Sequence, residues 1–161
     1  MLRLKKLLQK SLNGAARVAV VGIGSDLRAV DAAGELVAQQ VQKNLKKSSK
    51  TTAFFFTSTA PENFTGEIKK FRPGLVIIID AAELNKKPGA VIVIPSRKIS
   101  GESFSTHRIP TKVMADYLRL SLKCKVIVIG IQPKTIAFAK PVSKEVQSSI
   151  NNLAGILKDI L

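Results

Sequence analysis

The sequence contains a single cysteine, Cys124, among its 161 residues. One cysteine can form neither an intramolecular disulfide nor a zinc site built from several thiolates. This scarcity is typical of a reducing compartment, so we expect a cytoplasmic protein. Long apolar runs are also missing. The longest, such as 75–79 and 126–131, fall well short of the roughly 18 residues that indicate a membrane span, so we expect no transmembrane segment.

Acidic residues are scarce as well. The chain has 26 Lys and Arg against 11 Asp and Glu, a formal net charge of +15. Such an excess points to anionic partners rather than to any particular fold. Surfaces that stack single-stranded nucleic acid interleave cations with aromatic rings, but aromatic residues make up only 5% here, and three of them form the run Phe54–Phe56. We therefore expect most lysines to lie on solvated faces, with no nucleic-acid partner.

What the sequence does contain is a regular alternation of apolar segments. The expected helices cover 2–12, 31–47, 111–122 and 143–161, with a shorter one within 61–71, and the expected strands cover 17–23, 51–58, 75–79, 90–94 and 125–131. Strands that are apolar throughout and alternate with helices predict a mostly parallel sheet covered on both faces. We expect one domain over 1–161, an α/β protein whose three-layer α/β/α sandwich surrounds a twisted sheet of about five strands.

The first expected helix adds to this pattern. Leucines recur at helical spacing within 2–12, and Asn13-Gly14 follows in the manner of a helix end. The segment is too short and too charged for a signal peptide. A basic amphipathic helix can lie on a membrane surface, but packing against its own domain is the interpretation we favour.

Three chemistry-bearing residues follow the expected strands. Asp80 comes directly after the strand over 75–79, and Asp31 lies at the mouth of the helix after the first strand. His107, the only histidine, lies in the polar stretch after the fourth strand. Ligand sites of open α/β sheets gather at the carboxyl ends of the strands, so we expect all three at one edge. Two carboxylates and an imidazole suit a divalent ion such as nickel, zinc or iron, with coordination positions left open.

Each of these residues also has a structural explanation. Asp31 would be favoured at a helix N-terminus by the macrodipole. Asp80 could accept hydrogen bonds from backbone amides where its strand turns away, and His107 could be a surface loop residue. The sequence alone leaves both interpretations open.

Other chemistries find less support. The segment Gly22-Ile23-Gly24 follows a strand, but a dinucleotide fingerprint would need a third glycine at Leu27, and no Gly-Lys-Ser/Thr ending completes a P-loop. Cys124 precedes its strand, which would place it at the opposite edge from His107. A serine triad lacks the Gly-x-Ser-x-Gly elbow. A nucleotide-binding domain therefore ranks third, after a metal-dependent site and a basic binding module.

Several short motifs, taken together, resemble one family. In chain order they are Val21-Gly22-Ile23-Gly24-Ser25, Asp31-Ala32-Ala33-Gly34, Ala60-Pro61-Glu62-Asn63, Phe71-Arg72-Pro73, Val76-Ile77-Ile78-Ile79-Asp80-Ala81, Lys87-Pro88-Gly89, Ser105-Thr106-His107-Arg108-Ile109-Pro110 and Gly130-Ile131-Gln132-Pro133. The sequence resembles the nickel–iron hydrogenase maturation endopeptidases, and within them the HycI-type branch that processes large subunits of formate-hydrogenlyase-type hydrogenases. The resemblance assigns 16–161 to the protease domain and leaves the helix over 1–15 outside it.

The resemblance implies an activity and a site. It implies an endopeptidase that removes a C-terminal peptide from the hydrogenase large-subunit precursor after nickel has been inserted there. The family's catalytic and metal-contacting residues fall on Asp31, Asp80 and His107, the residues that the strand-edge argument selects. The nickel would be supplied by the precursor, and other divalent ions could take its place. A water nucleophile activated by a carboxylate or by the metal, and a monomeric enzyme, complete this expectation.

The chain also departs from the family pattern. The usual Gly-Asp-Asp-Gly-like stretch reads Ala29-Val30-Asp31-Ala32 here, so the second acid is kept and the first is Val30. An asparagine that usually follows the glycines is replaced by Ser25. Loss of one carboxylate makes the site less negative, which would weaken metal binding, although Asp26 in the preceding turn is a candidate for the missing charge. The alternative is a diverged basic module that binds nucleic acid or an acidic protein and has no peptidase activity.

Overall fold

The computed structural model describes the chain except residues 1, 25–31, 47–49, 59, 96–110 and 136–140. In chain order the elements are α1 (Leu2–Leu12), β1 (Arg17–Gly22), α2 (Ala33–Asn44), β2 (Thr51–Phe56), the 3-10 turn η1 (Pro61–Phe64), α3 (Thr65–Phe71), β3 (Leu75–Ala81), β4 (Val91–Pro95), α4 (Thr111–Leu122), β5 (Lys125–Ile131) and α5 (Lys144–Ile160). The strands form a five-stranded sheet in the order β2-β1-β3-β5-β4. Four strands run parallel, and β4 pairs antiparallel with β5.

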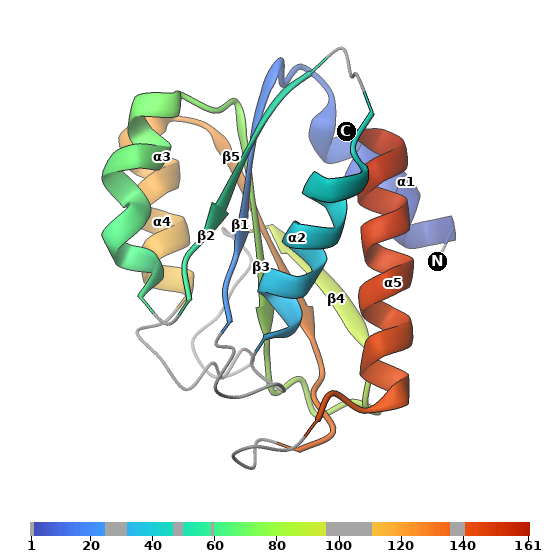
Figure 1. Ribbon diagram of the computed structural model, residues 1–161. Helices are drawn as coiled ribbons and strands as arrows, with labels where there is room; N and C mark the ends of the chain where they lie inside the picture. The colour runs from blue at the N-terminus through green and yellow to red at the C-terminus, as the bar shows by residue number, and fades with distance from the viewer. Residues whose placement is uncertain (1, 25–31, 47–49, 59, 96–110, 136–140) are drawn as a thin grey trace.

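The helices form a layer on each face of the sheet. Figure 1 shows α3 and α4 on one side and α2 and α5 on the other, with α1 beside α5. The expected three-layer α/β/α sandwich is confirmed. In the part of the chain that the structure describes, no helix is long and apolar enough to cross a bilayer.

The central strands are apolar because both of their faces are covered. In β3, Leu75, Ile77 and Ile79 join the core beneath α2 and α5, whereas Val76 and Ile78 join the core beneath α3 and α4. Side chains of a strand alternate between faces, so a strand between two helical layers must be apolar at almost every position. This is the physical origin of the continuous apolar run that predicted a buried strand.

The helix α1 packs on its own domain, as expected. Leu8 and Leu12 are buried in the core shared with α5. The Lys5 ammonium lies 3.1 Å from a carboxylate oxygen of Asp159 on α5. Beyond the helix end, Lys50 donates to the Ala15 carbonyl at 2.8 Å and Lys125 to the Asn13 carbonyl at 2.7 Å. Cations at a helix C-terminus offset its partial negative charge, so these lysines hold the end of α1 against the sheet.

Some boundaries differ from those expected. The strand expected over 51–58 ends at Phe56, which pairs with Gly22, the last residue of β1, and the Thr57 amide still donates to the Gly22 carbonyl at 3.1 Å. Ser58 then takes a left-handed conformation, with φ of 48°, that no strand can continue. The helix expected over 31–47 is described as Ala33–Asn44, and Leu45 is already extended.

The first turn of α2 lies against the ends of two strands. A Cβ atom built on Gly34 would lie 2.0 Å from the carbonyl oxygen of Ile79 and 2.5 Å from that of Ile23. Both of those atoms belong to backbone, which cannot rotate out of the way. Only glycine permits this approach, so α2 begins directly on the carboxyl ends of β1 and β3.

Replacing Gly34 by alanine should therefore destabilise the fold by about 3 kcal/mol or more, because the added methyl group displaces α2 from the sheet. The matched control is Gly155→Ala in α5, where an added Cβ meets nothing within 4 Å. That change should stabilise the protein by roughly 0.5–1 kcal/mol, since alanine is the better helix former. Denaturant unfolding of both variants measures the difference, and equal midpoints would contradict the proposed close contact.

Candidate active site at the carboxyl edge of the sheet

Asp80 is a nearly buried carboxylate at the carboxyl end of β3. Its side chain belongs to a residue that is only 7% exposed. Alternation along β3 places it on the α3 and α4 side, with Ile78. The Thr111 hydroxyl, at the start of α4, donates to Asp80 Oδ2 at 3.2 Å. The strand therefore places a carboxyl group at the edge of an apolar core. The Thr111 hydroxyl of the neighbouring helix orients that group.

The strand beside Asp80 carries a glycine at the paired position. In the parallel ladder between β3 and β5, the partner of Asp80 is Gly130. A glycine adds no side chain next to the acid. The motif Gly130-Ile131-Gln132-Pro133 thus places a residue without a side chain beside Asp80 and a polar residue two positions later.

That polar residue, Gln132, organises the turn after β3. It is 4% exposed, and its Oε1 accepts hydrogen bonds from the backbone amides of Leu84 at 2.7 Å and Lys86 at 3.3 Å. Its Nε2 donates to Glu83 Oε2 and to the Pro133 carbonyl, both at 3.1 Å. One buried amide group thereby ties the segment after Asp80 to the end of β5. The sequence motif contains this glutamine without indicating a role for it; a polar amide directly after a buried strand was the available signal.

Asp31 itself lies outside the described residues, but its neighbour in the chain is placed. Ala32 immediately precedes α2, whose Gly34 rests on the carbonyl oxygens at the ends of β1 and β3. The side chain of Glu35, one residue further on, accepts a hydrogen bond from the Ser58 amide at 3.3 Å. The chain therefore resumes after Asp31 at the same edge of the sheet as Asp80.

His107 also lies outside the described residues, and one premise of its prediction is wrong. We expected the fourth strand to end at the carboxyl edge, but β4 runs antiparallel. Its first residue, Val91, pairs with Ile131 at that edge, and its last, Pro95, pairs with Ile127 nearer the start of β5. The link between this part of the chain and the carboxyl edge is Thr111 instead. It lies four residues after His107 and contacts Asp80.

Of the three predicted site residues, only Asp80 is among the described residues. Asp80 is observed at the edge, and the described residues next to Asp31 and close after His107 lie at that edge too. Among the described residues no group of three His, Cys, Asp or Glu side chains is close enough to hold a metal ion. The ligand set Asp31, Asp80 and His107 remains a prediction.

Cys124 is far from this chemistry, as expected. It directly precedes β5, at the amino end of that strand. Burial raises the pKa of its thiol, which disfavours the nucleophilic thiolate at neutral pH. Cysteine-based peptide hydrolysis is therefore disfavoured.

Comparisons with known proteins agree on one family. A sequence model described as hydrogenase maturation protease matches residues 35–160. A putative hydrogenase maturation protease of Methanocaldococcus jannaschii is 31% identical over 163 aligned residues, which cover 98% of this chain and 96% of the relative. The hydrogenase 3 maturation protease of Escherichia coli is 27% identical over 81% of this chain and 82% of its own length.

Solved structures give the same result. The crystal structure of the hydrogenase maturation protease HycI from Thermococcus kodakarensis is similar with a TM-score of 0.85 and 30% identity, covering 96% of this chain and 98% of that one. The solution structure of the endopeptidase HycI from Escherichia coli has a TM-score of 0.75 and 26% identity, with coverage of 89% and 90%. The likeness therefore extends over nearly the whole fold.

The role given to Gln132 can be measured. Gln132→Ala leaves the buried Leu84 amide without an acceptor and should lower the free energy of unfolding by about 2 kcal/mol. Gln39→Ala is the control, because Gln39 is exposed on α2 and bonds only to Glu35 one turn away among the contacts described. Its effect should stay within about 0.5 kcal/mol. Equal losses in the two variants would show that Gln132 does not organise this turn.

Proposed function

Because the chain belongs to the hydrogenase maturation protease family and is a peptidase, we propose that it removes a C-terminal peptide from the large-subunit precursor of a nickel–iron hydrogenase once that precursor carries nickel. The observation that carries this proposal is the placement of Asp80. A nearly buried carboxylate lies at the edge where α2 begins and where Thr111 opens α4. A carboxylate held in this way is a candidate both for metal contact and for proton transfer.

In this proposal Asp31, Asp80 and His107 contact the nickel of the substrate. Carboxylate oxygens and an imidazole nitrogen are ligands that nickel accepts, and other divalent ions with similar preferences could take its place. Because the metal arrives bound to the precursor, its capture would hold the adjoining peptide segment at the edge of the sheet. Holding the scissile bond in a fixed position lowers the entropic barrier to its hydrolysis.

The described residues support specific roles within this scheme. The Thr111 hydroxyl fixes the orientation of the Asp80 carboxylate through its bond to Oδ2. The low exposure of Asp80 keeps bulk water from screening its charge. A water molecule, activated by a carboxylate or by the substrate's metal, is the proposed nucleophile. The proposal retains the cytoplasmic location and the monomeric state expected from the sequence.

The replacement of the usual first acid by Val30 bears on this proposal. It lies outside the described residues, and so does Asp26. With one carboxylate fewer, the enzyme should hold nickel less tightly by itself and depend more on the metal ligands of the precursor. The relatives named as maturation proteases and endopeptidases favour peptidase activity over the alternative of a diverged basic binding module.

The decisive test compares nickel-loaded with nickel-free precursor, with intact mass as the readout. The wild-type protein should remove the C-terminal peptide only from the loaded form. Asp80→Asn and His107→Ala should each slow that cleavage by at least about 100-fold, since they remove proposed metal and proton-transfer groups. Asp159→Asn, which alters a half-exposed acid on α5, is the matched control and should process normally. Wild-type rates in His107→Ala would refute the site, and cleavage of nickel-free precursor would refute metal recognition.

Thr111 offers a second test because its proposed role is positioning. Thr111→Val keeps the shape of the side chain but removes the hydroxyl that donates to Asp80, so kcat should fall by about tenfold. Thr111→Ser keeps the donor and should retain most of the activity. A structural role alone would make the serine variant, which loses a buried methyl group, as defective as the valine variant.

A further inference from the structure

Most of the large exposed apolar side chains that the structure describes lie on the helix α4. In the described part of the chain the large exposed apolar residues are Leu2, Leu7, Val113, Tyr117 and Leu120. Three of the five belong to α4, with exposed fractions of 55% for Val113, 46% for Tyr117 and 67% for Leu120. We call these three residues the α4 stripe.

The α4 stripe is separate from the core. Its members are spaced i, i+4 and i+7, which places them on one face of a helix. The buried residues of α4 include Met114, Ala115 and Leu118, which point into the core beneath the sheet. The sandwich therefore uses the inner face of α4, and the α4 stripe lies on its outer, partly exposed face.

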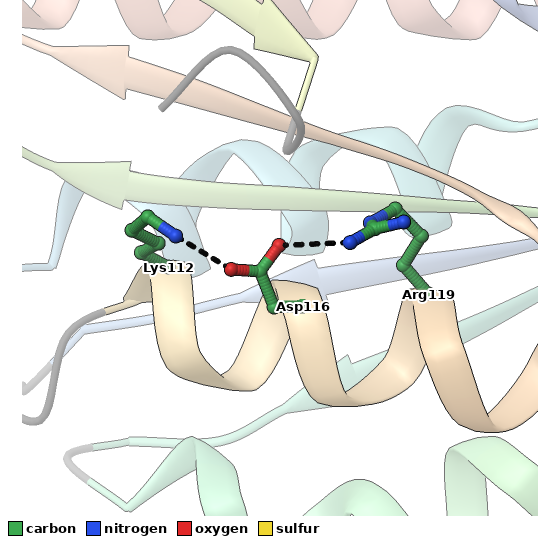
Figure 2. Close-up of polar contacts among 3 residues, drawn as sticks. All are labelled: Lys112, Asp116 and Arg119. Atoms are coloured by element: carbon green, nitrogen blue, oxygen red, sulfur yellow. Dashed lines mark hydrogen bonds and ion pairs between the residues drawn. The ribbon is translucent and has the colours of Figure 1, made fainter. Parts of the chain in front are cut away.

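Cations flank the α4 stripe. Along one side Lys112 and Arg119 lie on either side of Asp116, at 2.6 Å and 3.6 Å from its carboxylate oxygens (Figure 2). At Tyr117, the ammonium group of Lys69 on α3 lies 3.2 Å from the phenol hydroxyl and 5.2 Å from the centre of the ring. One carboxylate thus accompanies three cations, and this surface is positive as well as apolar.

The position of the α4 stripe ties it to the candidate site. Thr111, which bonds to Asp80, is the first residue of α4, and the stripe begins two residues later at Val113. With a rise of 1.5 Å per residue, the stripe extends roughly 10 Å along the helix from Val113 to Leu120. A partner seated on the α4 stripe would reach the edge where Asp80 is held at its Val113 end, while Leu120 lies near the far end of α4.

The charge decides between the candidate occupants. A second copy of this chain would bring another +15 to a surface that is already positive, which opposes self-association. Apolar residues surrounded by carboxylates would match both the stripe and its cations. We propose that the α4 stripe, with Lys69, Lys112 and Arg119, docks an acidic, apolar-centred surface of the hydrogenase large-subunit precursor. This inference rests on the proposed function for the identity of the partner.

The experiment measures binding and cleavage separately. Labelled protein is titrated with nickel-loaded precursor, and processing is followed by intact mass. Leu120→Asp should weaken precursor binding by about tenfold or more, because it removes apolar contact and places a negative charge against an acidic surface. Leu120→Lys removes the same contact but keeps the favourable sign, so it should bind more tightly than the aspartate variant. Leu2→Asp, which alters a similarly exposed leucine on α1, is the control and should bind as the wild type does.

Each outcome decides one of the two proposals. Wild-type affinity in Leu120→Asp, a defect as large in Leu2→Asp, or no binding of precursor to the wild type would each overturn the docking surface. Binding that depends on Leu120 without any cleavage would support the docking surface and refute the proposed function. A wild-type dimer that dissociates in Leu120→Asp, seen by light scattering, would assign the stripe to self-association and overturn the inference.

Discussion

The contact between the first turn of α2 and the ends of β1 and β3 is the constraint on which this structure depends. Gly34 lets a helix backbone approach two carbonyl oxygens closer than any side chain would allow. Because the helix begins there, the chain resumes after Asp31 at the carboxyl edge, beside the strand that carries Asp80. A methyl group at this one position would move the helix away from the edge where the chemistry is proposed.

Around that contact, hydrogen bonds hold the polar groups of the carboxyl edge in place. Thr111 orients the carboxylate of Asp80, and Gln132 holds the turn that follows it. Both groups are nearly buried, where an unpaired polar atom would be costly, so each pairing favours a single geometry. The opposite edge of the sheet serves stability instead, because Lys50 and Lys125 bind the end of α1 there and close the fold.

The scarcity of acidic residues has its clearest consequence on α4. A helix that contributes one face to the core ordinarily presents a polar face to solvent. Here the outer face carries Val113, Tyr117 and Leu120 with cations beside them. Because α4 also supplies Thr111 to the site, one helix connects a surface suited to an acidic partner with the carboxylate proposed to act on it.

Local sequence determined the helices and strands and made Asp80 a candidate site residue. The bounds of α4 and β5 agree with those expected from periodicity, because continuous burial and one-sided burial leave patterns within a few residues. A charge at the end of an apolar run predicted Asp80 as a site residue, although β3 continues through Asp80 to Ala81 and does not end at residue 79 as expected. The direction of β4, the carbonyl contacts of Gly34 and the bonds of Gln132 depend on residues far apart in the chain. No local pattern encodes such pairings, because each joins residues that are distant in sequence. Only the tertiary structure decided them, and it also decided that the start of α2 and the start of α4 lie at the carboxyl edge with Asp80.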